Sequence, residues 1–358
     1  MAAGYVECAS GLDDPYHRAR AASHILSFAC APTQYSGIAA NGQYCAMNDA
    51  QDSLVHELKS LSCWPAPVQT IRPLTGLSGG SLLIELCDGR RYVVRSQNAQ
   101  LQMQGVSRER ERQVLYAIGE QVARSDFLPQ VLFYNARWLV VSWLEGSPWP
   151  HTLADDTCAQ RHLVTLMRRF HPVDSELQLD IPSRLQFYRQ QLSAEKQSEA
   201  LFSLCARFAS LRSPCWWFPV LAHHDIHPGN LVSDGATLAL IDWEYAARSP
   251  LACELILLFE ANGFNRAQRQ QFCRYYAEAV YSTETVYAAD SECVGSSATA
   301  LEDWLHRLQQ DIVSWQPWCE MLMAMWSAIR FEQTDDAQYA VWRDNYLKAA
   351  EQSLGKRE

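Results

Sequence analysis

The spacing of apolar residues along this chain changes once, and that change limits the folds the chain can adopt. Residues 68–144 contain short apolar runs separated by turns, a pattern that predicts β-strands in meander order, interrupted by one helix around 109–118. After Trp149 the apolar residues recur at helical spacing. The exceptions are two short runs, 231–232 and 238–241, which flank a turn and are predicted to be strands.

This change divides the chain into two lobes and an N-terminal extension. We expect an α+β fold, with a small antiparallel β lobe in residues 47–146 and a larger, mainly helical lobe in residues 147–358. Residues 1–46 have no helical or strand period, whereas Met47 stands directly before an amphipathic helix. We therefore expect the extension to be disordered and dispensable, with a translated start placed too far upstream. The alternative is a segment that packs its aromatic residues onto the lobes.

Charge and cysteine usage exclude several classes of function. The 358 residues include 30 Lys and Arg against 40 Asp and Glu, a formal charge of −10, so no nucleic-acid partner is expected. No apolar run is long enough to cross a bilayer and no export signal is present, which predicts a cytoplasmic protein without a membrane partner. The 12 Cys show no paired spacing, so we expect reduced thiols and no zinc site.

Three polar residues at fixed spacing carry the strongest functional signal. Residues 223–230 are His-His-Asp-Ile-His-Pro-Gly-Asn, and Asp242 follows Asn230 by twelve residues. Phosphoryl transfer needs a carboxylate that accepts the proton of the attacking hydroxyl, and oxygen ligands for Mg²⁺. Asp225 suits the first role, and Asn230 and Asp242 suit the second. The alternatives are helix-capping and turn residues, or a transition-metal cluster that includes His223 and His227.

This pattern resembles the aminoglycoside phosphotransferase and choline kinase superfamily, whose fold is protein-kinase-like. The resemblance implies ATP and Mg²⁺ as cofactors, Asp225 as the catalytic base, and Asn230 and Asp242 as the metal ligands. It also implies that His223 supports the catalytic loop. Glu254, on an apolar helix, is predicted to be a buried brace for the same loop.

A glycine-rich turn and a basic strand residue fit the nucleotide phosphates. The turn contains Ser78, Gly79, Gly80 and Ser81, which can present backbone N–H groups and hydroxyls to an anion, although an ordinary hairpin turn has the same composition. Arg95 ends an alternating strand and stands where the superfamily usually has Lys.

Two further contacts with the nucleotide follow from the resemblance. Glu111 matches the acidic partner of the basic strand residue, with Glu109 as the second choice and a surface ion pair as the alternative. The apolar strand that ends near Gly146 matches the connection between the lobes. Backbone groups near Ser142 and Leu144 would then contact adenine, although the same residues also suit an ordinary linker.

Three stretches, 76–81, 92–95 and 241–246, resemble bacterial thiamine kinases more than other members of the superfamily. The expected activity is transfer of the γ-phosphate to a primary hydroxyl, with thiamine as the acceptor. Choline or ethanolamine kinase and aminoglycoside-type activity are the alternatives. A catalytically silent ligand-binding protein is the alternative of a different class.

The expected partner is a small, cationic alcohol, which aromatic faces and a carboxylate would bind. Glu244 is the candidate carboxylate, with anchoring of the loop as its alternative role. The candidate aromatic residues stand on one predicted helix and would otherwise pack in the core. They are Trp315, Trp318 and Trp326.

Overall fold

The structure is a computed structural model that describes residues 52–74, 81–150, 152–235, 237–287 and 297–355. The predicted extension and the Met47 start of the first helix lie outside these residues. The described part of that helix covers residues 52–59, and it places Leu58 in the core beneath the first sheet.

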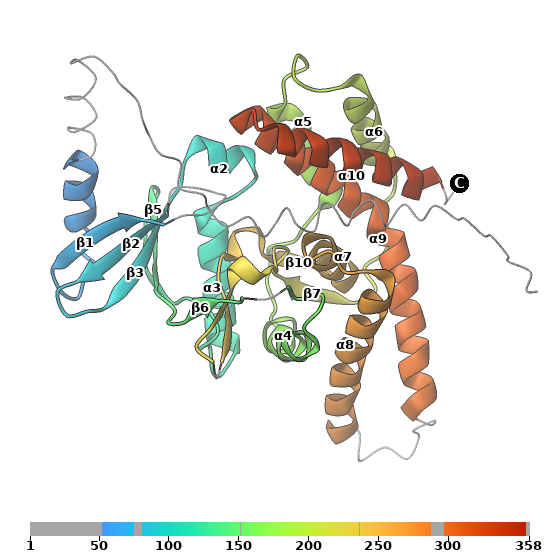
Figure 1. The fold of residues 1–358 in the computed structure, drawn as a ribbon, viewed down its shortest axis with the longest axis horizontal. Helices are drawn as coiled ribbons and strands as arrows, with labels where there is room; N and C mark the ends of the chain where they lie inside the picture. The colour runs from blue at the N-terminus through green and yellow to red at the C-terminus, as the bar shows by residue number, and fades with distance from the viewer. Residues whose placement is uncertain (1–51, 75–80, 151, 236, 288–296, 356–358) are drawn as a thin grey trace, which may run out of the picture.

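A five-stranded antiparallel sheet forms the N-terminal part of the fold (Figure 1). Its strand order is β1-β2-β3-β5-β4, so β5 lies between β3 and β4, and the predicted simple meander is wrong at this point. After β3 the chain passes through helices and returns as β4 at the edge of the sheet. β5 then turns back between β4 and β3 and pairs with both. The strands are β1 Val68–Pro73, β2 Ser81–Leu86, β3 Arg91–Ser96, β4 Val131–Tyr134 and β5 Trp138–Ser142.

Two helices, rather than the one predicted, connect β3 to β4. The first, α2 (Ala99–Met103), is capped by Asn98, whose side chain accepts a hydrogen bond from the N–H of Leu101. Its five residues are too few to show a helical period. The second, α3 (Arg108–Gln121), contacts β4, β5 and the short turn Trp243–Tyr245 of the C-terminal part.

The C-terminal part is mainly helical, as the sequence predicts, but contains more strands than expected. β8 and β9, of three residues each, are the two predicted runs, which the turn between them marks. β6, β7 and β10 were missed because they are equally short and pair with strands that are distant in the sequence, so no hairpin turn marks them. The strands are β6 Ser147–Pro148, β7 Pro219–Ala222, β8 Leu231–Ser233, β9 Leu238–Leu240 and β10 Ala247–Pro250. The helices are α4 Thr157–Phe170, α5 Ile181–Gln191, α6 Glu199–Ser210, α7 Leu251–Ala261, α8 Arg266–Tyr287, α9 Ser297–Thr334 and α10 Ala337–Gly355.

Helix α7 lies at the centre of this part (Figure 1). Its residues are apolar around most of its circumference. One side, with Leu255 and Phe259, packs into a core shared with α4 and α8. The other side, with Cys253 and Ile256, packs into a second core shared with α5, α6, α9 and α10. A helix that is apolar all round is typical of a buried position.

The predicted α+β fold is confirmed by the antiparallel sheet of the N-terminal part and the mainly helical C-terminal part. No helix among the described residues is long and apolar enough to span a membrane.

Candidate active site

The loop between β7 and β8 carries the segment predicted to be catalytic, and helix α7 holds this loop. The Glu254 carboxylate accepts hydrogen bonds from the backbone N–H groups of His223 (3.0 Å) and His224 (2.7 Å). His224 has a positive φ of 66°, a conformation that costs a residue other than glycine about 1–3 kcal/mol. Buried backbone N–H groups need hydrogen-bond partners. Glu254, which is 1% exposed, accepts from the N–H groups of both histidines and so offsets the cost of this conformation.

The imidazole of His223 joins the loop to the segment that leads to Asp242. Its Nε2 lies 3.0 Å from the carbonyl oxygen of Ile241, and its Nδ1 accepts a hydrogen bond from the backbone N–H of Asp225 (3.2 Å). These partners require a neutral ring with its proton on Nε2. Burial lowers the pKa of His223 to about 3, although Asp242 acts in the opposite direction.

Asp225 and Asn230 contact each other across the loop. The Asn230 amide donates to the backbone carbonyl of Asp225 (2.9 Å) and to its carboxylate oxygen Oδ2 (3.0 Å). The Asp225 side chain is 34% exposed, and Nε2 of His227 lies 3.8 Å from Oδ2. Partial burial of the carboxyl raises the pKa of Asp225 and the nearby Asp242 raises it further, whereas His227 and the Asn230 amide lower it. A carboxylate with a raised pKa is a better proton acceptor.

The β8–β9 hairpin brings Asp242 to the same end of the site. Leu231 at the start of β8 pairs with Leu240 at the end of β9, so Asn230 precedes this end of the hairpin and Ile241 and Asp242 follow it. The backbone N–H of Ile241 donates to the carbonyl oxygen of Asn230 (2.9 Å). The structure therefore brings together the three polar residues of the predicted motif.

Asn230 and Asp242 offer the hard oxygen atoms that Mg²⁺ prefers. The Asn230 amide directs its NH₂ group toward Asp225, which leaves its oxygen facing away. Burial alone would raise the pKa of Asp242, but the charge and hydrogen bond of Arg95 hold that pKa below its ordinary value, so Asp242 stays ionised. The described residues contain no cluster of three His, Cys, Asp or Glu side chains able to hold a metal. Two protein ligands nevertheless suit Mg²⁺, which usually keeps water and phosphate oxygens in its other positions.

Arg95 of β3 is the centre of a buried ion network. Its guanidinium contacts the carboxylates of Glu111, Asp242 and Glu244, the last at 2.7 Å. Arg108, the first residue of α3, adds ion pairs to Glu111 (2.7 Å) and Glu244 (2.8 Å). The side chains of Arg95, Arg108, Glu111 and Glu244 are each 7% exposed or less.

The two candidate acidic partners on α3 lie on different faces of the helix. Glu111 points into the network and pairs with Arg95 and Arg108. Glu109 instead pairs with Arg112 on the outer face, at 2.6 Å. The contact with the strand arginine is therefore made by Glu111, and Glu109 makes the surface ion pair that the sequence also allowed.

Glu244 does not have the surroundings predicted for a substrate carboxylate. Its side chain is 3% exposed and is occupied by Arg95 and Arg108, because α3 and β3 each direct one guanidinium toward it. Two guanidiniums already satisfy this buried carboxylate, so the prediction that it faces a cationic alcohol is wrong. Its contacts fit the alternative, anchoring of the loop.

Two of the three candidate tryptophans are core residues. α9 carries all three, but Trp315 and Trp318 are 2% and 1% exposed and pack in the core of α5, α6 and α7. Trp318 meets Phe208 of α6 edge-on, with ring centroids 5.1 Å apart. Their prediction as substrate-binding faces is therefore wrong. Trp326 is half-buried and donates its Nε1–H to the Tyr245 hydroxyl (3.0 Å), which places it beside the segment after Asp242.

The structure describes only the end of the glycine-rich turn. Ser78, Gly79 and Gly80 lie outside the described residues. Ser81 begins β2 and stands opposite Arg95 in the pairing of β2 with β3. This register places the end of the turn next to the ion network.

The connection between the two parts of the fold follows β5. The backbone N–H of Ser142 donates to the carbonyl oxygen of Gln130 (2.8 Å), so an adenine contact at Ser142 would use the Ser142 carbonyl. Leu144, the second predicted contact, is half-buried.

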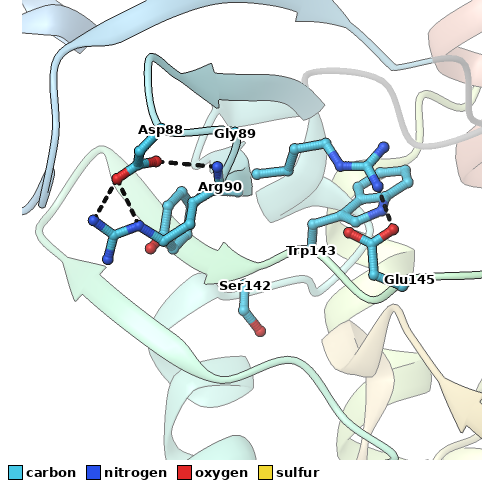
Figure 2. Close-up of a pocket in the computed structure, with 8 residues that line it drawn as sticks. Asp88, Gly89, Arg90, Ser142, Trp143 and Glu145 are labelled. Carbon is cyan, nitrogen blue, oxygen red and sulfur yellow. Dashed lines mark hydrogen bonds and ion pairs between the residues drawn. The ribbon is translucent and has the colours of Figure 1, made fainter.

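A pocket of about 440 Å³ lies beside this connection (Figure 2). Figure 2 shows Arg90 bonded to Asp88 on one side of the pocket and Trp143 beside Glu145 on the other. Its lining contains none of the predicted catalytic or metal-binding residues.

Sequence reasoning missed two residues of the site. Arg108 is 1% exposed and completes the ion network, and the three-residue spacing to Glu111 was its one local signal. His224 uses both ring nitrogens, with Nδ1 3.0 Å from the carbonyl of Tyr245 and Nε2 2.8 Å from the hydroxyl of Ser249. The spacing of the motif does not indicate that His224, in addition to the adjacent His223, holds the loop by its ring.

Comparison with known proteins gives a family match and relatives over most of the chain. A model described as the phosphotransferase enzyme family matches residues 70–288. A thiamine kinase of Escherichia coli is 28% identical over 288 residues, which cover 79% of this chain and 91% of that protein. A thiamine kinase of Shigella flexneri matches with the same identity and coverage.

Solved structures show the same fold at lower identity. A choline kinase from Streptococcus pneumoniae superposes with a TM-score of 0.58 at 16% identity, covering 87% of this chain and 99% of that one. An ethanolamine kinase from Plasmodium vivax gives a TM-score of 0.58 at 12% identity, covering 96% of this chain and 95% of that one. The protein-kinase-like fold predicted from the sequence is confirmed.

Proposed function

Because the chain belongs to the phosphotransferase enzyme family, whose model matches more than half of its length, we propose that it transfers the γ-phosphate of ATP to the primary hydroxyl of thiamine. The observation that carries the proposal is the meeting of Asp225, Asn230 and Asp242 at one end of the β8–β9 hairpin, with Arg95 in contact with Asp242. A base, two oxygen ligands and a phosphate-neutralising cation are the groups that phosphoryl transfer needs.

Asp225 accepts the proton in this mechanism. The acceptor hydroxyl oxygen forms a bond to the γ-phosphorus, the bond from that phosphorus to the β–γ bridging oxygen breaks, and the hydroxyl proton passes to the Asp225 carboxylate. The raised pKa of Asp225 favours this transfer. Asn230 holds one carboxylate oxygen by its 3.0 Å hydrogen bond and so fixes the direction of the other.

The remaining residues bind the nucleotide. Asn230 and Asp242 would hold Mg²⁺, which when bound offsets the negative charge of the phosphates. Arg95 stands beside Asp242 and adds a permanent positive charge, and Glu111 orients it. Backbone groups at Ser142 and Leu144 and the turn at 78–81 would contact adenine and phosphates, respectively.

Thiamine is supported as the acceptor by the similarity to thiamine kinases over most of both chains. Trp326 remains the aromatic candidate for the cation, because it is half-buried and bonded to Tyr245. The chain would act in the cytoplasm without nucleic-acid or membrane partners, as its charge and apolar pattern predict.

An acceptor panel tests the proposal. ATP and Mg²⁺ are supplied with thiamine, choline, ethanolamine or an aminoglycoside, and ADP and the phosphorylated product are both measured. We expect the highest kcat/KM with thiamine and its loss by about 10²–10⁴-fold in Asp225→Asn. Greater efficiency with another acceptor would reject thiamine. Nucleotide binding without product from any acceptor would favour the silent ligand-binding protein.

The same panel gives a prediction for Asp225 itself. Asp225→Asn should bind nucleotide as well as the unchanged chain does, because Asn230 and Asp242 remain in place. The exposed Asp174→Asn is the control, since it removes one carboxylate that pairs with Arg248 and contacts none of the proposed site residues. Turnover of Asp225→Asn close to that of the control would remove Asp225 from the role of base.

A further inference from the structure

A second pocket, of about 630 Å³, lies between the N-terminal helices and α5. Met103 of α2, Val106 and Phe187 of α5 form its apolar wall, and Arg110 of α3 and Arg184 of α5 line it with two guanidiniums. Its volume is in the range of small-molecule sites, about 300–1,000 Å³. None of the catalytic or metal-binding residues proposed above lines it.

The two arginines lack the carboxylate partners that their neighbours have. On the same helix, Arg108 pairs with Glu111 and Arg112 pairs with Glu109. Arg110 is half-buried and has no ion pair among the described residues, and the same holds for Arg184. Burial lowers the pKa of Arg110, and the charge of Arg184 lowers it further. Two like charges are therefore held together in a chain whose formal charge is −10.

The backbone at Gly105 is shaped to hold Arg184. Gly105 has a φ of +74°, and a Cβ at this position would lie 1.8 Å from Nη1 of Arg184. The same Nη1 donates a hydrogen bond to the Gly105 carbonyl (3.1 Å). The absence of a side chain thus allows the guanidinium to lie across the backbone. One nitrogen is fixed there, and the guanidinium has further donors for a ligand.

We propose that this pocket binds a small molecule with a phosphate group and an apolar, ring-bearing body, with the phosphate between Arg110 and Arg184 and the body against Met103, Val106 and Phe187. Guanidiniums bind phosphate oxygens in pairs of parallel hydrogen bonds, and a dianion offsets both charges at once. The apolar wall would contribute burial of the ring. A ligand bound in this pocket would contact both α5 and α3, the helix that carries Glu111.

Calorimetric titration of the full chain with phenyl phosphate tests the proposal. A non-hydrolysable ATP analogue with Mg²⁺ is kept saturating, so that the probe does not enter the nucleotide site. We expect saturable binding that weakens at least tenfold in Arg110→Gln and in Arg184→Gln. Arg266→Gln is the matched control, because it removes the same charge from an exposed position at the start of α8 and should leave the affinity unchanged.

Two further measurements make the assignment specific. Benzoate should bind more weakly than phenyl phosphate, because a carboxylate has fewer oxygens and less charge to share between two guanidiniums. Unliganded Arg110→Gln should melt at or above the temperature of the unchanged chain, since it relieves repulsion without breaking an ion pair. The proposal fails if the unchanged chain does not bind phenyl phosphate, if Arg110→Gln binds as tightly as Arg266→Gln, or if benzoate binds as tightly as phenyl phosphate.

Discussion

At the scale of single residues, the guanidinium of Arg95 contacts carboxylates from two distant parts of the chain. A lysine would keep the positive charge, but its single ammonium cannot reach Glu111, Asp242 and Glu244 in the same fixed geometry. We expect Arg95→Lys to raise the KM for ATP roughly tenfold, which is about 1.4 kcal/mol, and to retain measurable turnover.

Steady-state kinetics with varied ATP measure this change. Arg137→Lys is the control, because Arg137 directly precedes β5 of the same sheet but pairs with Glu57 at the surface. Equal KM values for the two variants would place Arg95 outside the phosphate site.

His171 gives a pH dependence that can be measured separately from catalysis. It is 3% exposed, its Nδ1 lies 2.7 Å from the Tyr276 hydroxyl, and burial lowers its pKa to about 3. In the unfolded chain its pKa is about 6.5, so below that pH the unfolded state binds a proton that the folded state does not. The stability contributed by neutral His171 is therefore present above about pH 6.5 and declines as the pH falls toward 3.

Urea unfolding of the unchanged chain and of His171→Gln at two pH values isolates this effect. From about pH 7.5 to about pH 5, the unfolding free energy of the unchanged chain should fall by about 2 kcal/mol more than that of His171→Gln. Because other titrating groups are common to both proteins, they cancel in the difference. A difference that does not change with pH would show that His171 titrates normally when folded.

The residues of the site differ in how far the sequence predicts their positions. Asp225, Asn230 and Asp242 could be placed together because a loop, a strand, a turn and a strand fix their separation locally. Arg108 could not, since its partner Glu244 is 136 residues away and only the fold brings them into contact. The role of Glu244 was mistaken for the same reason.

At the scale of elements, α7 connects the core to the loop between β7 and β8 through Glu254. Glutamine at this position keeps one oxygen acceptor but places an NH₂ group toward one of the two backbone N–H groups. We expect Glu254→Gln to lower the unfolding free energy by about 1–3 kcal/mol and to reduce kcat more than it changes the KM for ATP, because the loop that carries Asp225 would shift.

The control is Glu260→Gln on the same helix, which weakens a partly exposed ion pair with Arg269 and should cost about 1 kcal/mol or less. Denaturant unfolding and steady-state kinetics are measured for both variants. A kcat for Glu254→Gln as high as that of Glu260→Gln would show that the loop does not depend on this carboxylate.

Element length and local turns decide how much of the fold was predictable. The long helices and the strands of five or six residues show a clear period, and the turn between β8 and β9 marks these two short strands. α2, β6, β7 and β10 are too short to show a period and have no such turn. The spacing of Trp315 and Trp318 correctly indicates one helix. It does not show which elements cover that helix, and α5 and α6 do so here.

At the scale of the whole molecule, the ion network links the N-terminal sheet and α3 to the segment after β9. Arg108→Met would leave Glu111 and Glu244 buried with Arg95 as their remaining cation. Removing one partner of a buried pair costs about 3–5 kcal/mol, so a large fall in the melting temperature is expected. The fall should appear in a single calorimetric transition, because the network joins the two parts.

Arg112→Met is the matched control on the same helix. Arg112 pairs with Glu109 at the surface, and its loss should cost about 1 kcal/mol or less. Similar melting temperatures for the two methionine variants would show that the buried network does not stabilise the molecule.

The same network has an excess of acid over base. Two guanidiniums, those of Arg95 and Arg108, face three carboxylates, those of Glu111, Asp242 and Glu244. In their fully ionised forms these groups carry one negative charge in excess, so a polyphosphate arriving without a counterion meets repulsion. Burial raises the pKa of Glu244 to about 8, so protonation of this carboxyl below that pH removes the excess. We therefore expect the ionised site to favour nucleotide already complexed with a divalent cation over free nucleotide, before any contact with the base or the sugar.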